Sequence, residues 1–208
     1  MNIMFDVGAN WGTDSLDFIR NNNDWVCFAF EPTPQLFAHL VNASAGFKDR
    51  YFVYPYAISD FVGKANFNVA GQSDWGCSSL LNFIPDTNLF WKDRYDFKVT
   101  DTLEVDAIRL DTFIKFLNIE FIDYFHCDVQ GMDLTALESF GNYISIVKEG
   151  QIEVSNKKDV LYTNSNNYVE DAIIFLEKHN FSIKGIYPND IHNNEANLVF
   201  INKLHNTV

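Results

Sequence analysis

Short apolar runs alternate with segments whose apolar positions recur at helical spacing along most of the 208 residues. The runs predict strands and the segments between them predict helices. Thr13 or Asp14 is well placed to cap the first helix, and Pro34 suits the first turn of the second. The predicted strands are 3–7, 25–30, 51–57, 64–69, 103–108, 121–129, 144–154, 181–187 and 197–202, and the predicted helices are 14–20, 34–41, 110–117, 133–140 and 168–179.

This order of elements predicts an α/β fold. Alternating strands and helices form a mostly parallel sheet with helices on both faces. The last two strands are joined directly by the polar loop PNDIHNNE, so they must be antiparallel. We therefore predict a Rossmann-like, seven-stranded sheet with a closing antiparallel strand, in a single domain over residues 1–208.

The pattern breaks once, at about residues 71–100, which mix aromatic with polar and turn residues and match neither period. We interpret this segment as an aromatic-rich insertion. It could cover a ligand as a lid or substrate wall, since sugars stack their C–H faces on aromatic rings. It could equally pack on the core or on a dimer partner.

Composition narrows the classes of protein. Hydrophobic residues make up 47% and aromatic residues 16% of the chain, which indicates a globular protein. The net charge of -13 argues against nucleic acid or an anionic membrane surface as the main partner. No apolar run reaches the roughly 18 residues of a membrane span, and no leader is visible, so we expect a cytoplasmic protein. Cys27, Cys77 and Cys127 lack metal-type spacing and are expected to be buried and reduced.

The first candidate site is the stretch FDVGANWGTDS, which runs from the first strand into a helix. Gly8 and Gly12 allow a tight turn and a close approach of a ligand to the backbone. Glu31 ends the next strand, where an acid binds the ribose hydroxyls of a nucleoside. The loop lacks the middle glycine of a pyrophosphate site, and Asp6 suits an ammonium or sulfonium better than a pyrophosphate. Both points favour S-adenosyl-L-methionine over NAD, while a structural corner without a ligand stays an alternative.

Five segments in order resemble the motifs of the FkbM-family methyltransferases over about residues 3–155: FDVGANWGTDS, FAFEPTP, YPYAISDFVG, IRLDTFI and IDYFHCDVQGMDLTALESFG. The resemblance implies a class I methyltransferase fold, S-adenosylmethionine as donor, and transfer to a hydroxyl, often of a sugar or natural product. By motif match, the implied cofactor-binding residues are Asp6, Gly8, Asn10 and Gly12 near the methionine, Glu31 at the ribose, Ala57 and Ile58 near the adenine, and Asp128 at the end of the fourth strand.

Two departures from the family pattern are visible. The family commonly has a lysine two residues before the last of these acids, and this chain has His126. The helix that often precedes the first strand is missing, which leaves one flank of the site less covered, or covered by a partner chain. Homo-oligomerisation is therefore left open.

Four side chains are candidates for the chemistry. Asp128 could take the acceptor proton, hold the donor's amino group or bind a metal, or simply cap the next helix. His126 lies on the same side of its strand as Asp128. His192 lies in the closing loop, and histidine is a residue type that is chemically suited to act as a base. Glu153 resembles a glutamate common in the family near the end of the fifth strand. The last three residues each have a structural alternative. His126 could be a buried imidazole, His192 a solvated loop histidine and Glu153 an ordinary strand-end acid.

The acceptor side is predicted from fewer signals. Trp75, Trp91 and Tyr95 are candidate substrate contacts, and Ser78 lies in a segment that resembles a family segment near the site. No Cys/His cluster has zinc spacing, so no structural metal is predicted. A magnesium ion at Asp128, Glu153 or Asp133 stays open.

Together these signals predict an S-adenosylmethionine-dependent O-methyltransferase acting on a hydroxyl of a glycan, sugar or small-molecule natural product. A nicotinamide-dependent oxidoreductase and a non-catalytic binding module on the same fold are the alternatives.

Overall fold

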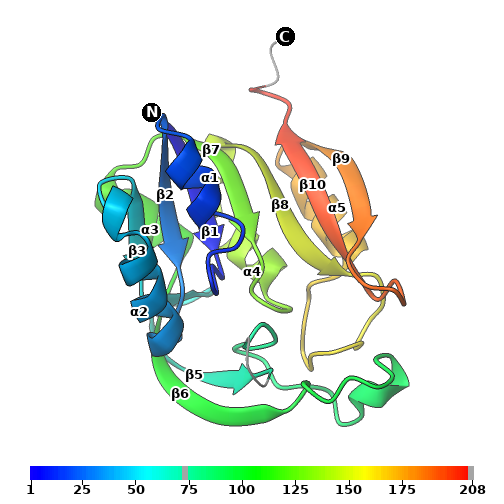
Figure 1. Cartoon of the computed structure of the whole chain (residues 1–208). Helices are drawn as coiled ribbons and strands as arrows, with labels where there is room; N and C mark the ends of the chain where they lie inside the picture. The colour runs from blue at the N-terminus through cyan, green and yellow to red at the C-terminus, as the bar shows by residue number, and fades with distance from the viewer. Residues whose placement is uncertain (72–74, 206–208) are drawn as a thin grey trace.

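The computed structural model describes residues 1–71 and 75–205. Seven strands form one sheet in the order β3-β2-β1-β7-β8-β10-β9 (Figure 1). β10 is antiparallel to both β8 and β9, and the other pairs are parallel. The predicted fold class is confirmed. The strands of this sheet are β1 (Asn2–Val7), β2 (Trp25–Phe30), β3 (Tyr51–Tyr54), β7 (Ile122–Cys127), β8 (Val147–Ser155), β9 (Phe181–Pro188) and β10 (Glu195–Asn202).

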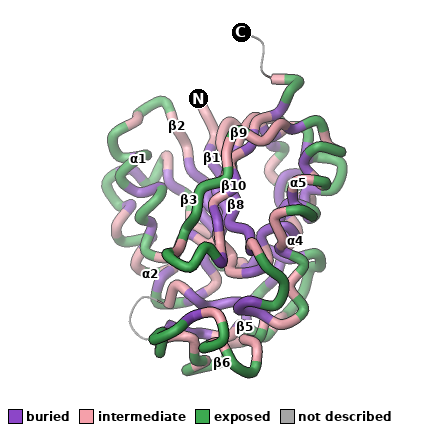
Figure 2. Tube along the Cα trace, turned by 90° about the vertical axis from the view of Figure 1, so that its right-hand side faces the viewer, coloured by how far each residue is buried: buried purple, intermediate pink, exposed green. Residues whose placement is uncertain are grey.

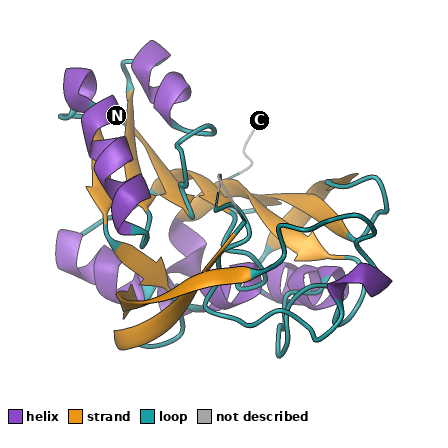
Figure 3. Ribbon diagram, turned by 60° about the horizontal axis from the view of Figure 1, so that its bottom comes forward, coloured by secondary structure: helices purple, strands orange, loops and turns teal. Residues whose placement is uncertain are grey.

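Helices cover both faces of this sheet (Figure 3). One apolar cluster joins α1 (Leu16–Asn21) and α2 (Pro34–Ala43) to Met4, Cys27 and Ala29 of the strands. The larger cluster joins α3 (Leu110–Leu117), α4 (Asp133–Glu138) and α5 (Val169–Lys178) to the opposite face of the same strands. Because a central parallel strand is buried on both faces, it reads as a continuous apolar run. Figure 2 shows these buried positions along the strands, with exposed positions on the loops and outer helix surfaces.

A second, three-stranded sheet was not foreseen. Residues 51–57 were predicted to form one strand, but the chain breaks at Pro55 and β4 (Tyr56–Ile58) joins β5 (Gly63–Ala70) and β6 (Val99–Ile108), in the order β4-β6-β5. Proline has no N–H for a continuous ladder, which explains the break. In Figure 1 this small sheet lies beyond the carboxyl ends of β1, β2 and β7, where it adds a wall to that edge.

Several predicted boundaries are wrong, among them the start of β6, which lies at Val99 rather than at residue 103. The first helix begins at Leu16 rather than at residue 14, so neither Thr13 nor Asp14 caps it. β8 begins at Val147 rather than at residue 144, because the 3-10 helix η3 (Gly141–Ile146) precedes it. The helix predicted over residues 133–140 ends at Glu138, with Ser139 as its C-cap.

Part of the aromatic insertion packs as a small core of its own. The 3-10 helix η2 (Thr87–Leu89) lies within it, and residues 72–74 of the segment fall outside the described residues. Trp91 is buried against Leu161 and Tyr162, with Phe83 and Phe97 packed beside them. The insertion therefore contacts the segment that follows β8, on the same side of the molecule as the small sheet.

In the part of the chain that the structure describes, no helix has both the length and the apolar character needed to cross a bilayer. Cys27, Cys77 and Cys127 are buried, as expected, and none of them forms a disulfide bond.

Candidate functional site

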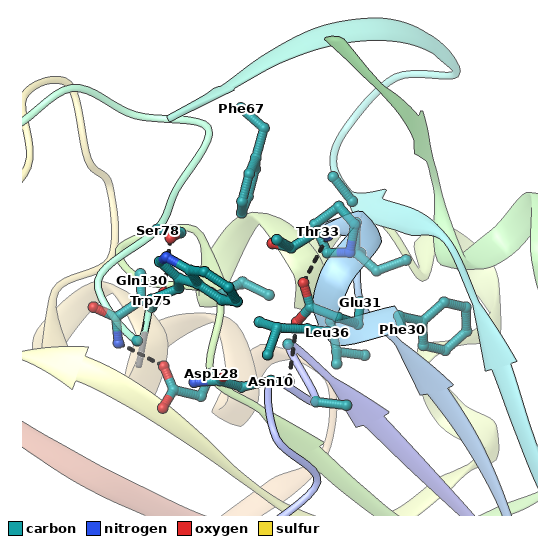
Figure 4. A pocket seen from close by; sticks show the side chains of 18 of the residues that line it. Asn10, Phe30, Glu31, Thr33, Leu36, Phe67, Trp75, Ser78, Asp128 and Gln130 are labelled. Atoms are coloured by element: carbon teal, nitrogen blue, oxygen red, sulfur yellow. Dashed lines mark hydrogen bonds between the residues drawn. The ribbon is translucent and has the colours of Figure 1, made fainter. Parts of the chain in front are cut away.

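A cleft opens at the carboxyl ends of β1, β2 and β7, and it encloses about 850 Å³ including its open mouth (Figure 4). Its walls come from the β1–α1 loop, the end of β2, β4, the insertion and the β7–α4 loop. In sheets of this type, ligands bind at this edge. The residues that line the cleft include Gly8, Asn10, Glu31, Leu36, Ala57, Ile58, Phe67, Trp75, Ser78, Asp128 and Gln130.

The β1–α1 loop runs very close to the β7–α4 loop. Gly8 has φ +84°, and a Cβ there would lie 1.9 Å from the backbone oxygen of Asp128. The N–H groups of Gly8 and Ala9 both donate to the oxygen of Phe30, at 3.0 Å. Gly12 also has positive φ (+77°), but it lies against Leu16 and does not line the cleft. Both glycines are therefore required by the backbone, and of the two only Gly8 lines the cleft.

Asn10 presents an unsatisfied acceptor beside this loop. Its φ is 48°, and its Oδ1 atom is buried without a hydrogen-bond partner among residues 1–71 and 75–205. A buried polar atom in this state is costly unless a ligand supplies the missing donor. Asn10 Oδ1 is thus suited to an ammonium or hydroxyl group of a ligand in the cleft.

Glu31 ties the loops of β1 and β2 together. Its Oε2 accepts from the N–H of Asn10 at 2.9 Å, and its Oε1 accepts from the N–H of Thr33 at 2.7 Å (Figure 4). Burial raises the pKa of this carboxyl, and the two N–H donors oppose the rise. Each carboxylate oxygen keeps a further lone pair for a ligand hydroxyl.

The rest of the cleft is largely apolar. Ala57 and Ile58 come from β4, Phe67 from β5 and Leu36 from α2. Trp75 closes the wall and stacks on Trp11 with ring centroids 6.1 Å apart and planes at 11°. Figure 4 places Glu31 and Asp128 at opposite sides of the cleft, with Asn10 between them. A nucleoside-sized ligand in the cleft would contact the flat apolar wall near Glu31 and extend toward Asp128.

Asp128 follows β7 and lines this cleft. Its Oδ1 accepts from Nε2 of Gln130 at 2.7 Å, and burial raises its pKa. The same Nε2 donates to Oε2 of Glu153 at 3.0 Å. The Tyr162 hydroxyl donates to Oε1 of Gln130 at 2.8 Å. Gln130 is therefore fixed between the half-buried carboxylate of Asp128 and the buried carboxylate of Glu153, in a left-handed conformation with φ 55°.

Glu153 lies in β8, behind Gln130, and does not line this cleft. Its Oε1 accepts from Nδ2 of Asn189 in the β9–β10 loop. Burial, and then the charge of Asp128, raise its pKa well above the usual value. A second cavity adjoins this carboxylate.

His126 and Asp6 form a buried pair below the cleft and line neither cavity. Nδ1 of His126 lies 2.9 Å from Oδ1 of Asp6, whose other oxygen accepts from the Ser15 hydroxyl. Burial would lower the pKa of His126, but the hydrogen bond and charge of Asp6 outweigh it and raise the pKa to about 9. The structure thus places these two predicted site residues together, beneath the loop that carries Gly8.

The remaining predicted residues are spread more widely. Ser78 lines the cleft, with its hydroxyl donating to the oxygen of Trp75 at 2.7 Å. Trp91 lines the second cavity. His192 is exposed and its N–H donates to Asp190, while Tyr95 is 77% exposed; neither lines either cavity. The sequence did not single out Gln130, Asn189 or Glu195, since their roles depend on which loops meet in space.

Within residues 1–71 and 75–205, no group of three or more His, Cys, Asp or Glu side chains is arranged to hold a metal ion. Asp128 and Glu153 are bridged by Gln130, and Asp133 is held by Asn167 at 3.2 Å.

The strand order, the glycine loop and the acid at the end of β2 define the class I methyltransferase fold. Residues 6–183 match the family model described as the methyltransferase FkbM domain, so the chain belongs to this family of S-adenosylmethionine-dependent methyltransferases. Family membership removes the nicotinamide-dependent alternative.

One curated relative and two solved structures show the range of similarity. The 2-O-methyltransferase NoeI of Sinorhizobium fredii (strain NBRC 101917 / NGR234) is 29% identical over 136 residues, which is 63% of this chain and 54% of that protein. The chain thus spans about half the length of this curated relative. Sp1610 of Streptococcus pneumoniae has a TM-score of 0.52 at 13% identity, over 97% of this chain and 64% of that chain. The human methyltransferase 10 domain containing protein has a TM-score of 0.50 at 8% identity, over 97% of this chain and 72% of that chain. Both structures show the shared fold.

Proposed function

We propose that this chain is an S-adenosylmethionine-dependent O-methyltransferase that acts on a hydroxyl of a sugar, glycan or small-molecule natural product in the cytoplasm, as a single domain. The observation that carries the proposal is the position of Asp128, which lines both the cleft and the adjoining cavity. A carboxylate at such a junction can serve a donor on one side and an acceptor on the other. The name of the relative NoeI, a 2-O-methyltransferase, supports oxygen as the acceptor atom.

The residues of the cleft suit this donor. Glu31 offers lone pairs to the ribose hydroxyls, and Ala57, Ile58 and Leu36 offer an apolar surface to the adenine. Asn10 Oδ1, which lacks a partner among the described residues, suits the donor's ammonium group. When bound, S-adenosylmethionine supplies a methyl group on a sulfonium. The chain mainly has to align that group with the acceptor, and alignment can contribute several kcal/mol.

Asp128 is the base in this proposal. A hydroxyl that gains a methyl group must lose its proton, and the Asp128 carboxylate takes it. Burial raises the pKa of Asp128, which strengthens it as a proton acceptor at neutral pH. The Gln130 amide, 2.7 Å away, orients the carboxylate. His192, exposed and outside both cavities, is the weaker candidate for the base.

Methyl transfer to a panel of neutral glycosides, amino glycosides and phenols, with formation of S-adenosylhomocysteine and the product mass as readouts, tests the proposal. We expect the wild type to methylate a hydroxyl of at least one class and Asp128→Asn to lose that activity. Methyl transfer to nitrogen or carbon, or transfer that Asp128→Asn leaves intact, would contradict it.

A further inference from the structure

A second cavity lies directly beside the donor cleft and shares Gly76, Asp128 and Gln130 with it. It encloses about 600 Å³ including its open mouth. That size suits a ring with substituents. Its other walls come from the aromatic insertion and from the ends of β8 to β10, through Cys77, Trp91, Arg94, Phe97, Glu153, Leu161, Asn189, Asp190 and Glu195.

The wall formed by the insertion is fixed and aromatic. Trp91 is 3% exposed, and its Nε1 donates to the oxygen of Val160 at 3.1 Å. The rings of Trp91 and Phe97 meet edge to face, with centroids 5.3 Å apart. The guanidinium of Arg94 lies 4.3 Å from the centre of the Phe97 ring and pairs with Asp96. Arg94 is thus paired with Asp96, and its charge also opposes the rise in the pKa of Glu195, which lines the same cavity.

The opposite wall is a row of hydrogen-bond acceptors. Glu153 is held by Asn189 and by Gln130. The half-buried Glu195 is different, because its carboxylate accepts no hydrogen bond from any residue in the described ranges. Burial, and then the charge of Asp128, raise the pKa of Glu195 to about 8. Its oxygens are therefore free to accept a hydrogen bond from a donor, or to pair with a cation, that enters the adjoining cavity.

We propose that this cavity binds the methyl acceptor, and that the acceptor is an amino sugar: a hydroxyl-rich ring with a protonated amine against Glu195. The inference rests on the proposed function, because the shared residue Asp128 then stands between donor and acceptor. Sugar hydroxyls and ammonium groups donate hydrogen bonds, which the carboxylates of Asp128 and Glu195 can accept. An acidic sugar would add a like charge to a buried acidic wall and is excluded.

The test titrates the full chain, presaturated with S-adenosylhomocysteine, with the methyl glycosides of glucosamine, glucose and glucuronic acid. These rings share hydroxyls and differ mainly in charge. We expect the glucosaminide to bind at least about tenfold more tightly than the glucoside, and the glucuronide most weakly. Glu195→Gln should cut the preference for the amine to about threefold or less. The matched control Glu104→Gln, an exposed acid on β6, should keep it.

The outcomes separate this inference from the proposed function. If S-adenosylhomocysteine binds but the glucuronide binds as tightly as the glucosaminide, or no glycoside binds at tens of millimolar, the acceptor assignment is wrong and the donor site stands. An amine preference that survives Glu195→Gln also overturns the assignment. Failure of S-adenosylhomocysteine to bind would remove both proposals together.

Discussion

Nδ1 of His126 on β7 lies 2.9 Å from Oδ1 of Asp6 on β1, and both side chains are buried. The two strands are adjacent and parallel, and Asp6 is the register partner of His126. The pair therefore links the two central strands directly beneath the loop that carries Gly8 and Asn10. Asp6 also accepts from the Ser15 hydroxyl at the start of α1. This network connects the core of the sheet to the β1–α1 loop.

The His126–Asp6 pair predicts a pH dependence of stability. The pKa of His126 rises from 6.5 to about 9 on folding, so its stabilising contribution is complete below 6.5 and is lost as the pH rises through about 9. We expect the wild type to lose on the order of 2–3 kcal/mol of unfolding free energy from this pair between those pH values. Urea denaturation over this range measures the loss.

Glu195, with a pKa of about 8, also makes the protein less stable as the pH rises. The contribution of His126 is therefore isolated by comparing the wild type with His126→Gln. That variant should be less stable at neutral pH and should lose less stability as the pH rises. Parallel curves for the two proteins would show that His126 is not charged in the folded state.

Gly8→Ala should damage both stability and the donor site. The added Cβ would lie 1.9 Å from the oxygen of Asp128, and the φ of +84° is unfavourable for alanine. We expect a loss of roughly 2–4 kcal/mol in unfolding free energy and no detectable donor binding. Gly46→Ala is the matched control, because nothing lies within 4 Å of its Cβ, and it should stay within about 1 kcal/mol of wild type. A stable Gly8→Ala protein would contradict the close approach of the two loops.

Asp128→Asn should reduce turnover far more than donor affinity. Removing a positioned base costs about 10²–10⁴-fold in rate, whereas the dissociation constant for S-adenosylhomocysteine should change by about threefold or less. The wild-type rate should fall as the pH drops through the raised pKa of Asp128, since the base must be unprotonated. Single-turnover kinetics with the acceptor found in the panel measure both effects. Unchanged turnover would move the base to His192.

Gln130→Glu tests the residue between the two acids. The substitution keeps the shape but replaces an amide that donates to Asp128 and Glu153 with a third carboxyl group. Like charges raise the pKa of neighbouring acids, so the acid limb of the pH–rate profile should move to higher pH. Gln35→Glu, at an exposed position of α2, should leave the profile in place. A profile that does not move would show that Gln130 does not act on Asp128.

The sequence predicted the parts of the site that are local. The glycine loop and the acid at the end of the next strand lie within one strand–helix–strand unit, so their spacing carries the signal. Asp128 could be predicted from local sequence as well, because it directly follows an apolar strand. Pro55 could have signalled the break between β3 and β4, because proline has no N–H for the ladder.

The acceptor side depends on contacts between distant segments. Glu195 lines the same cavity as Glu153 only because β10 pairs antiparallel with β8, with Glu195 opposite Ser155. Gln130 acts through side chains from β8 and from the segment that carries Tyr162. Ser15 bonds Asp6 instead of capping the helix that it precedes. No local period or spacing encodes these partners.

Isothermal titration of the wild type and Glu31→Gln with S-adenosylhomocysteine tests most directly whether this cleft binds the methyl donor, with urea denaturation of both proteins as the control for folding. We expect one micromolar site in the wild type, weakened about tenfold or more in the folded variant by the loss of ribose hydrogen bonds. No binding by the wild type, or equal binding by both proteins, would contradict the assignment of this cleft as the donor site.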